Sequence, residues 1–297
     1  MPALQILSTQ PFSGKTTIAV AVARGLAEGG AAIRLVRAGS GAAADEDALT
    51  FASYLWAGSA GQPVAKIPAA ARGETLVVEL DAGAEPDAKL PALIAVRGVP
   101  TDADRALAAS LGDRLAGTIA ICVNPTAIED VARELTNSNL RPLALIPEDR
   151  LLSAPSVAEI GASLGARTLY AGENEREVVE DVLIGPVYAD PARPHFRRFA
   201  SKAILAPFNK TDLHLAAIET NAACLVITGG KEPSPYVLDR VQGEATTILL
   251  SDKDTPGTVA SLAGVWSHSR FRGDRKSDAA YAYLQGRVDF ASLARKL

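Results

Sequence analysis

The stretch STQPFSGKTTIAVAVARGL, residues 8–26, joins an apolar run to a helical pattern through a loop that ends in Gly-Lys-Thr. A strand, a loop with this ending and a helix form the context of a phosphate-binding loop, G-x-x-x-x-G-K-[ST]. Thr9 stands where that pattern has its first glycine, and Pro11 has no backbone N–H to offer a phosphate. The stretch therefore indicates either a variant phosphate-binding loop or a helix start that merely contains Gly-Lys-Thr.

The phosphate-binding interpretation gives each residue at the end of the loop a role. Backbone amides at the start of the helix would face an anion, because the helix dipole places partial positive charge there. Lys15 would reach terminal phosphate oxygens, and the Thr16 hydroxyl would contact Mg²⁺. The predicted nucleotide-binding residues of the loop are Ser13, Gly14, Lys15, Thr16 and Thr17, and Thr16 is also a predicted metal ligand.

Short apolar runs alternate with helical patterns along the rest of the chain. Nearly continuous apolar strands with helices between them are typical of parallel sheets covered on both faces. The predicted strands are, in chain order, 4–9, 32–38, 75–81, 92–98, 118–124, 142–148, 202–208, 223–230 and 246–252. The sequence therefore predicts an α/β fold, with a parallel-sheet P-loop NTPase-like domain followed by a smaller α/β domain.

The length of the chain indicates its number of domains, and its net charge indicates which classes of partner it is suited to bind. A chain of 297 residues is long for one core, so two domains are expected, over 1–172 and 173–297, with a linker near 172–175. The net charge of −4 argues against nucleic acid as a partner, since phosphate backbones are bound by clustered Lys and Arg. No apolar run is long enough to cross a bilayer, and the N-terminus lacks a basic signal-peptide region. We expect a cytoplasmic protein with no membrane partner.

The loop resembles that of dethiobiotin synthetase and its relatives, in which a threonine occupies the place of Thr9 and a glycine often precedes it. In this chain the preceding residue is Ser8. The loop is also similar to the one that opens the long bacterial phosphate acetyltransferases, whose N-terminal domain is dethiobiotin synthetase-like and does not catalyse acyl transfer. The resemblance implies ATP and Mg²⁺ as the ligands of this site.

Three further residues of the first half gain roles from this resemblance. TLVVELDAG, residues 75–83, is similar to the family strand that ends in Glu-Gly, so Glu79 falls on a glutamate that would hold Mg²⁺. Asp81 lies on the same side of an extended strand and would share that role, although either residue could instead cap the following turn. Arg37 stands where relatives have a lysine and would hold a phosphate without replacing a catalytic lysine. Asp47 resembles a family aspartate near the metal, and a plain helix N-cap explains it equally well.

The segment TIAICVNPTA, residues 118–127, resembles the strand whose asparagine recognises adenine in this superfamily. Asn124 is therefore a predicted nucleotide-binding residue, although Pro125 replaces the usual lysine. Gln10 stands where dimeric relatives of the partitioning-ATPase type have a signature lysine, which argues against their nucleotide-sandwich switch.

The second half resembles the DRTGG domain of phosphate acetyltransferases. Four segments follow that pattern in order, beginning at 181, 209, 224 and 249. FNKTD at 208–212 stands where the family motif reads Gly-Asp-Arg-x-Asp, so Lys210 takes the place of the arginine. The resemblance covers roughly Leu4–Leu262, and we expect no counterpart of the acyltransferase catalytic domain.

Loops at 209–212, 228–231 and 252–255 are each predicted to leave the carboxyl end of a strand, where open sheets bind ligands. A small metabolite would bind there through Lys210 or Lys231. A structural or dimer-forming role is the alternative, because Asp212 and Asp254 are good N-caps and glycines form turns.

These observations lead to one functional hypothesis and two alternatives. The first is a nucleotide-binding regulatory protein that biases its own assembly or an acyltransferase partner, and the DRTGG resemblance implies that it is a homo-oligomer. The second is an ATP-dependent ligase of the dethiobiotin synthetase type, with Lys15, Thr16 and Glu79 around Mg-ATP. The third is a scaffold that has lost nucleotide binding, which rests on the departures at Ser8 and Pro11 and at Asn124-Pro125.

Overall fold

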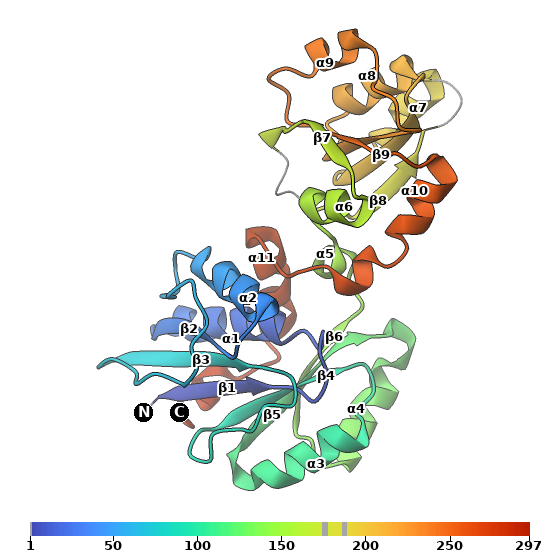
Figure 1. Ribbon diagram of the computed structural model, residues 1–297. Coiled ribbons are helices and arrows are strands. Elements are labelled where there is room, and N and C mark those ends of the chain that lie inside the picture. The colour runs from blue at the N-terminus through green and yellow to red at the C-terminus, as the bar shows by residue number, and fades with distance from the viewer. Residues whose placement is uncertain (1, 174–177, 186–188) are drawn as a thin grey trace. The chain divides into compact units, whose positions relative to one another are not determined.

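Two compact units make up the chain. The first unit consists of the residues up to Leu152 together with Phe271–Leu297, and the second unit consists of Ser153–Arg270. Each unit is built on its own β-sheet (Figure 1). The computed structural model describes residues 2–173, 178–185 and 189–297.

The first unit contains a six-stranded sheet in which every pairing is parallel. The strand order is β2-β3-β1-β4-β5-β6. The strands are β1 (Ala3–Leu7), β2 (Ala32–Ala38), β3 (Glu74–Leu80), β4 (Ala92–Arg97), β5 (Leu115–Val123) and β6 (Pro142–Pro147). The helices are α1 (Lys15–Glu28), α2 (Ala42–Ala52), α3 (Asp102–Leu111), α4 (Ile128–Asn137), α11 (Asp274–Leu284) and α12 (Phe290–Ala294), and α5 (Arg150–Ser153) spans the border of the units.

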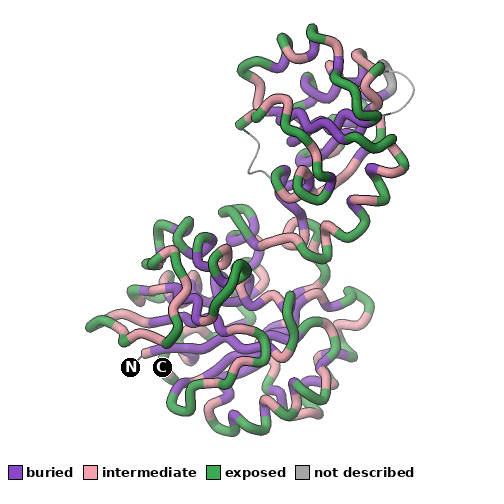
Figure 2. Tube along the Cα trace, viewed as in Figure 1, coloured by how far each residue is buried: buried purple, intermediate pink, exposed green. Residues whose placement is uncertain are grey.

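Two hydrophobic cores cover the two faces of this sheet, because successive strand residues point to opposite faces. In β1, Leu4 and Ile6 belong to one core, and Ala3 and Leu7 belong to the other. The first core includes residues of α1, α2, α11 and α12, and the second includes residues of α3 and α4. Buried residues therefore follow the strands closely (Figure 2).

The second unit contains a five-stranded sheet of order β7-β11-β10-β9-β8, in which only β7 is antiparallel to its neighbour. α7, α8 and α9 contribute to the core on one face, and α6 and α10 contribute to the core on the other. The strands are β7 (Arg167–Tyr170), β8 (Asp181–Ile184), β9 (Lys202–Pro207), β10 (Cys224–Thr228) and β11 (Thr247–Leu250). The helices are α6 (Val157–Leu164), α7 (Ala189–Phe196), α8 (Thr211–Glu219), α9 (Pro235–Arg240) and α10 (Thr255–Leu262).

The predicted fold class is confirmed: a parallel-sheet unit is combined with a second, smaller α/β unit. Each of the nine predicted strands overlaps a strand of the structure. β7 and β8 are additional, and each is only four residues long. β11 is equally short but lies within the apolar run 246–252, whereas the residues of β7 are exposed or half-buried and form no apolar run.

The borders between the compact units lie after Leu152 and after Arg270. The border expected from the sequence is between residues 172 and 173. β7 pairs with β11, so this strand belongs to the second unit although it precedes residue 172. Phe271, Leu284 and Leu293 are buried in the same core as α1, so the last two helices belong to the first unit. Both results depend on contacts between distant segments. Of the linker expected near 172–175, residues 174 and 175 lie outside the described residues.

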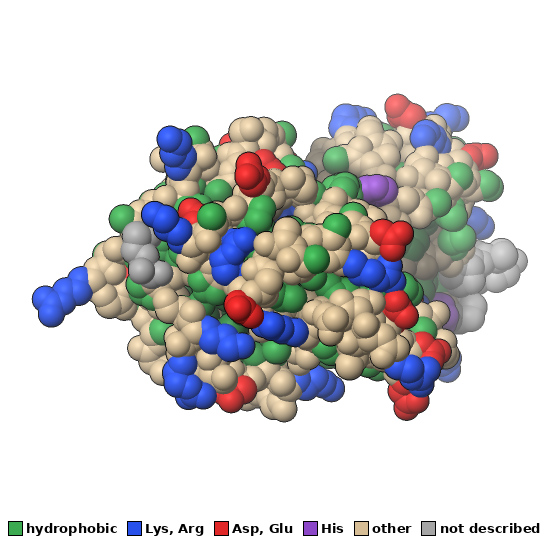
Figure 3. Space-filling view, turned by 90° about the horizontal axis from the view of Figure 1, so that it is seen from below, with side chains coloured by type: hydrophobic (Ala, Val, Ile, Leu, Met, Phe, Trp, Pro, Cys, Tyr) green, Lys and Arg blue, Asp and Glu red, His purple; other side chains and the backbone are tan. Residues whose placement is uncertain are grey.

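Two properties of the described surface bear on possible partners. Across the described residues, no helix combines the length and apolar character that a bilayer crossing requires. On the face seen in Figure 3, basic and acidic side chains are interspersed, and the described residues form no continuous basic surface there.

The packing of α12 on α1 generates a stability prediction at Gly25. Alanine normally stabilises a helix interior relative to glycine. Here a Cβ at residue 25 would lie 2.3 Å from the Phe290 ring. Gly25→Ala is therefore expected to lower the free energy of unfolding by about 1–3 kcal/mol through overpacking. Urea denaturation followed by circular dichroism measures the change.

Gly161→Ala in α6 is the matched control for this experiment. A Cβ at residue 161 would lie 3.6 Å from Leu249, which is an ordinary contact. This change is expected to leave stability unchanged or to raise it slightly. Equal destabilisation by both changes would contradict the close approach of Phe290 to Gly25.

Candidate functional site

The candidate site lies at the carboxyl end of β1, where the order of the strands reverses. β1 is flanked by β3 and β4, and the chain forms the β2-β3 side of the sheet before it crosses to β4. In open α/β sheets, ligands bind at the carboxyl ends of strands at such a switch point. The loop 8–14 leaves β1 here, and α1 begins at Lys15.

Two residues of the loop adopt left-handed backbone conformations. Phe12 has a φ of 54°, and Gly14 has a φ of 71°. A side chain at residue 14 would also clash with its surroundings, because a Cβ would lie 2.7 Å from Cδ1 of Ile121. The second glycine of the motif is therefore required by both conformation and packing.

The two departures from the usual loop pattern have structural partners. Thr9, in place of the first glycine, donates its hydroxyl to Oδ1 of Asp104 in α3, at 2.7 Å. Ser8 is buried, donates its hydroxyl to the Gln10 carbonyl at 2.8 Å, and accepts a hydrogen bond from Nζ of Lys15 at 2.9 Å. These side chains thus tie the front of the loop to α3 and to Lys15.

Lys15 is a buried cation at the start of α1. Its side chain is 7% exposed, and burial lowers its pKa, while the neighbouring carboxylate of Glu79 opposes that shift. Ser13 and Thr17 are also buried, and the Ser13 hydroxyl donates to the Gln10 carbonyl at 2.7 Å. Of the predicted loop residues 13–17, three are therefore buried, and Gly14 and Thr16 are half-buried.

Glu79 provides a carboxylate oxygen that lacks a partner. The Thr16 hydroxyl donates to Oε1 of Glu79 at 3.2 Å. Oε2 is buried and has no hydrogen-bond partner within the described part of the chain. Burial, reinforced by the nearby charge of Asp47, raises the pKa of Glu79 to about 7, against the opposing influence of Arg37 and Lys15.

The Thr16 hydroxyl and the Glu79 carboxylate fit the protein's share of a magnesium site. Mg²⁺ is commonly held by one or two protein oxygens together with substrate phosphates and water. The described residues contain no group of three or more His, Cys, Asp or Glu side chains placed to hold a metal alone. The remaining ligands of a metal at this position would come from a bound phosphate and water.

Arg37 lies in a network of carboxylates on the β2-β3 side of the site. It is 5% exposed, and its Nε donates to Oδ2 of Asp47 at 3.2 Å. Its Nη2 donates to Oδ1 of Asp81 at 2.5 Å, and Nε lies 3.9 Å from Oε1 of Glu79. This arrangement favours holding the carboxylates over holding a phosphate. Asp47 lies inside α2 and pairs with Arg37, so it does not act as an N-cap.

Asn124 lies apart from the loop residues. It follows β5, two strands from β1 in the sheet, and it is exposed. Its Oδ1 accepts hydrogen bonds from the backbone N–H of Thr126 at 3.0 Å and from the Thr126 hydroxyl at 2.8 Å. Its carbonyl oxygen therefore caps the following turn, and base recognition by its amide group stays a prediction.

Arg97 is a site residue that sequence reasoning missed. It is the last residue of β4, and its Nη1 donates to the backbone carbonyl of Phe12 at 2.8 Å. The signal in the sequence is a basic residue at the carboxyl end of a predicted strand. That signal was insufficient, because the sequence does not show that β4 lies beside β1.

The loops expected to bind a ligand in the second unit are joined to one another by backbone hydrogen bonds. The N–H of Phe208 donates to the Thr228 carbonyl at 3.0 Å, and the N–H of Gly229 donates to the Lys253 carbonyl at 2.8 Å. Asp254 accepts from the N–H of Gly257 and caps α10. The three loops therefore share one edge of the sheet as predicted, and these hydrogen bonds account for part of their polar character.

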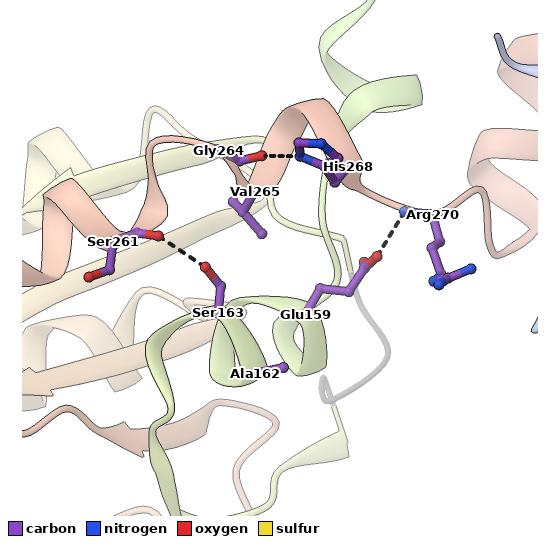
Figure 4. Close-up of a pocket in the computed structure, with 8 residues that line it drawn as sticks. All are labelled: Glu159, Ala162, Ser163, Ser261, Gly264, Val265, His268 and Arg270. Carbon is purple, nitrogen blue, oxygen red and sulfur yellow. Dashed lines mark hydrogen bonds between the residues drawn. The ribbon is translucent and has the colours of Figure 1, made fainter. Parts of the chain in front are cut away.

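A pocket of about 370 Å³ lies elsewhere in the second unit, between α6 and the segment 261–270 (Figure 4). Glu159 accepts a hydrogen bond from the backbone N–H of Arg270 at 2.8 Å, and the Ser163 hydroxyl donates to the Ser261 carbonyl at 3.0 Å. These polar groups hold the segment onto α6. The pocket is at the C-terminal end of α10, whereas the predicted ligand loop 252–255 is at its N-terminal end.

Comparison with known proteins gives matches over both units. The family model for the DRTGG domain matches residues 159–265, within the second unit. A phosphate acetyltransferase from Nitratidesulfovibrio vulgaris is 24% identical over 182 residues, which cover 57% of this chain and 25% of that protein. The chain thus spans about a quarter of the length of this curated relative.

Two solved structures show limited similarity to parts of this chain. One contains the CBS and DRTGG domains of the regulatory region of Clostridium perfringens pyrophosphatase complexed with the activator diadenosine tetraphosphate. It is 19% identical, covers 43% of this chain and 56% of that chain, and has a TM-score of 0.35. The other is the MinC:MinD cell division protein complex of Aquifex aeolicus. It is 18% identical, the match covers 51% of this chain and 84% of that chain, and the TM-score is 0.37. The family match is what identifies a DRTGG domain in the second unit.

The buried carboxyl of Glu79 predicts a pH dependence of stability. In the unfolded chain it ionises near 4.5, whereas in the folded protein it keeps its proton up to about 7. Between these values the folded state binds more protons, so the contribution of Glu79 to stability falls as pH rises and is constant above about 7. We therefore expect Glu79→Gln to gain stability relative to the wild type as pH rises through this range, by on the order of 3 kcal/mol.

Urea denaturation from pH 4 to 8 without Mg²⁺ or nucleotide measures this difference. Glu129→Gln, which removes an exposed carboxylate from α4, is the control for a general charge effect. A constant difference between wild type and Glu79→Gln at all pH values would contradict the prediction.

Proposed function

We propose that this chain is a cytoplasmic regulatory protein that binds ATP or a related nucleotide with Mg²⁺ at the loop 8–16. The observation that carries the proposal is the combination of buried Lys15 with the Thr16–Glu79 pair, in which one buried carboxylate oxygen has no partner among the described residues. A cation for phosphate and oxygens for a metal thus lie side by side at one helix start.

The start of α1 supports the phosphate-binding part of this proposal. The first turn of α1 contains no acidic residue, and among the described residues no side chain caps its amides. Helix starts have unpaired N–H groups and partial positive charge, which favour a bound phosphate. The amides of residues 13–17 and the Lys15 ammonium would bind the phosphates in this proposal.

The metal-binding part rests on Thr16 and Glu79. These two residues would hold Mg²⁺, with phosphate and water as the remaining ligands. The ion would supply charge neutralisation of the phosphates. Asp47 is assigned to the outer part of the same site, because Arg37 already pairs with its carboxylate.

A regulatory role is favoured over a ligase role by the environment of Arg37. Relatives of the dethiobiotin synthetase type have a lysine at this place, whereas the guanidinium here is directed at three carboxylates. The DRTGG match in the second unit and the match to part of a phosphate acetyltransferase support the same choice. In this proposal, nucleotide binding biases homo-oligomer formation or an acyltransferase partner, which requires measurable coupling between two sites.

The first test is a calorimetric titration of Mg-ATP into the full chain. We expect the wild type to bind and Lys15→Ala to bind at least about tenfold more weakly, because a buried charge-assisted contact to phosphate is lost. Lys89→Ala removes an exposed lysine from the same unit and is expected to leave the affinity unchanged. Failure of the wild type to bind would contradict the proposal.

A turnover assay separates the regulatory proposal from the ligase alternative. We expect no ADP release above background when carboxylate-bearing substrates are added to the protein with Mg-ATP. Sustained release that depends on such a substrate and is lost in Lys15→Ala would instead support the ligase.

A further inference from the structure

Arg97 connects β4 to the proposed phosphate-binding loop. Its Nη1 donates to the backbone carbonyl of Phe12 at 2.8 Å. Within the described residues the guanidinium forms no ion pair with a carboxylate, and its side chain reaches the surface. A hydrogen bond from a guanidinium is charge-assisted and stronger than one between neutral groups.

Phe12 needs such an anchor because of its backbone conformation. Its φ of 54° lies in the left-handed region, which a residue with a Cβ adopts only at a cost. Phe12 is 58% exposed. The contact from Arg97 acts on the carbonyl group of the strained residue itself.

The direction of the Phe12 carbonyl determines the direction of the next amide. A trans peptide is planar, and its C=O and N–H groups point in opposite directions. With the carbonyl of Phe12 held towards Arg97, the N–H of Ser13 points away from Arg97. Ser13 supplies the first of the amides that the proposed function assigns to the phosphates.

We propose that Arg97 is a positioning residue for nucleotide phosphates, which it acts on through the backbone of Phe12. This inference rests on the proposed function of the loop and adds a residue from a different strand to it. Arg97 holds the loop in its left-handed form before the ligand arrives, so binding does not have to order the loop.

The contact between Arg97 and Phe12 can be removed without removing backbone hydrogen bonds of the sheet. The end of β4 is joined to β5 by the hydrogen bond from the Gly98 N–H to the Ile121 carbonyl, at 2.8 Å. Removal of the Arg97 side chain leaves this backbone bond in place. Arg97→Ala is therefore expected to remain folded and to unfold at only a slightly lower urea concentration than the wild type, because the hydrogen bond to Phe12 is the interaction that is lost.

Calorimetry with Mg-ATP on the full chain tests the proposal. Arg97→Ala is expected to weaken binding by about tenfold, and Arg97→Lys, which keeps a charged donor, to recover part of the loss. Arg114→Ala is the matched control. Arg114 also donates to a backbone carbonyl of the same unit, that of Asp87 at 2.9 Å, but away from the loop, so we expect no change.

A double-mutant cycle with Phe12→Gly tests whether Arg97 acts through residue 12. Glycine adopts the left-handed conformation without a Cβ penalty, so the loop then depends less on Arg97. We expect Arg97→Ala to weaken Mg-ATP binding less in the Phe12→Gly background than in the wild type, which is the signature of coupled residues.

The outcomes distinguish this inference from the proposed function. If the wild type binds Mg-ATP and Arg97→Ala binds equally well, the inference is overturned and the proposed function stands. The same loss in both backgrounds also overturns it, because Arg97 would then act independently of Phe12. If the wild type does not bind, the proposed function fails, and this inference fails with it.

Discussion

The register of three adjacent parallel strands is the constraint on which the candidate site depends. Ile6 of β1 lies opposite Glu79 of β3, and Glu79 lies opposite Arg37 of β2. Arg37 and Glu79 therefore share one side of the sheet, next to the point where β1 enters the loop. A slip of one residue would move Glu79 to the other face of the sheet, because side chains alternate along a strand.

This register brings unlike charges together where water is largely excluded. Burial disfavours the charged forms of both Lys15 and Glu79, and their mutual attraction only partly offsets this effect. Arg37 compensates Asp47 and Asp81 but leaves one oxygen of Glu79 without a hydrogen-bond partner among the described residues. Such incomplete satisfaction is costly in a folded protein and is common at functional sites.

The two units differ in how their strand ends are used. At the carboxyl edge of the first sheet, a cation, a helix start and a partnerless carboxylate oxygen lie together. At the corresponding edge of the second sheet, three loops are joined by backbone hydrogen bonds. Lys231 lies there with its Nζ 5.1 Å from the centre of the Phe208 ring. The physical case for ligand binding is therefore stronger in the first unit.

The sequence by itself determined the features that depend on neighbouring residues. Apolar runs and turn residues located nine strands and the strand–loop–helix at 4–28. The motif spacing selected Lys15 and Thr16, and the resemblance to the dethiobiotin synthetase family selected Glu79. The tertiary structure alone decided the placement of the last two helices, the border of the units, the three-carboxylate environment of Arg37 and the contact of Arg97 with Phe12. The last of these joins residues 85 positions apart. Such contacts follow from strand order and packing, which local sequence patterns do not specify.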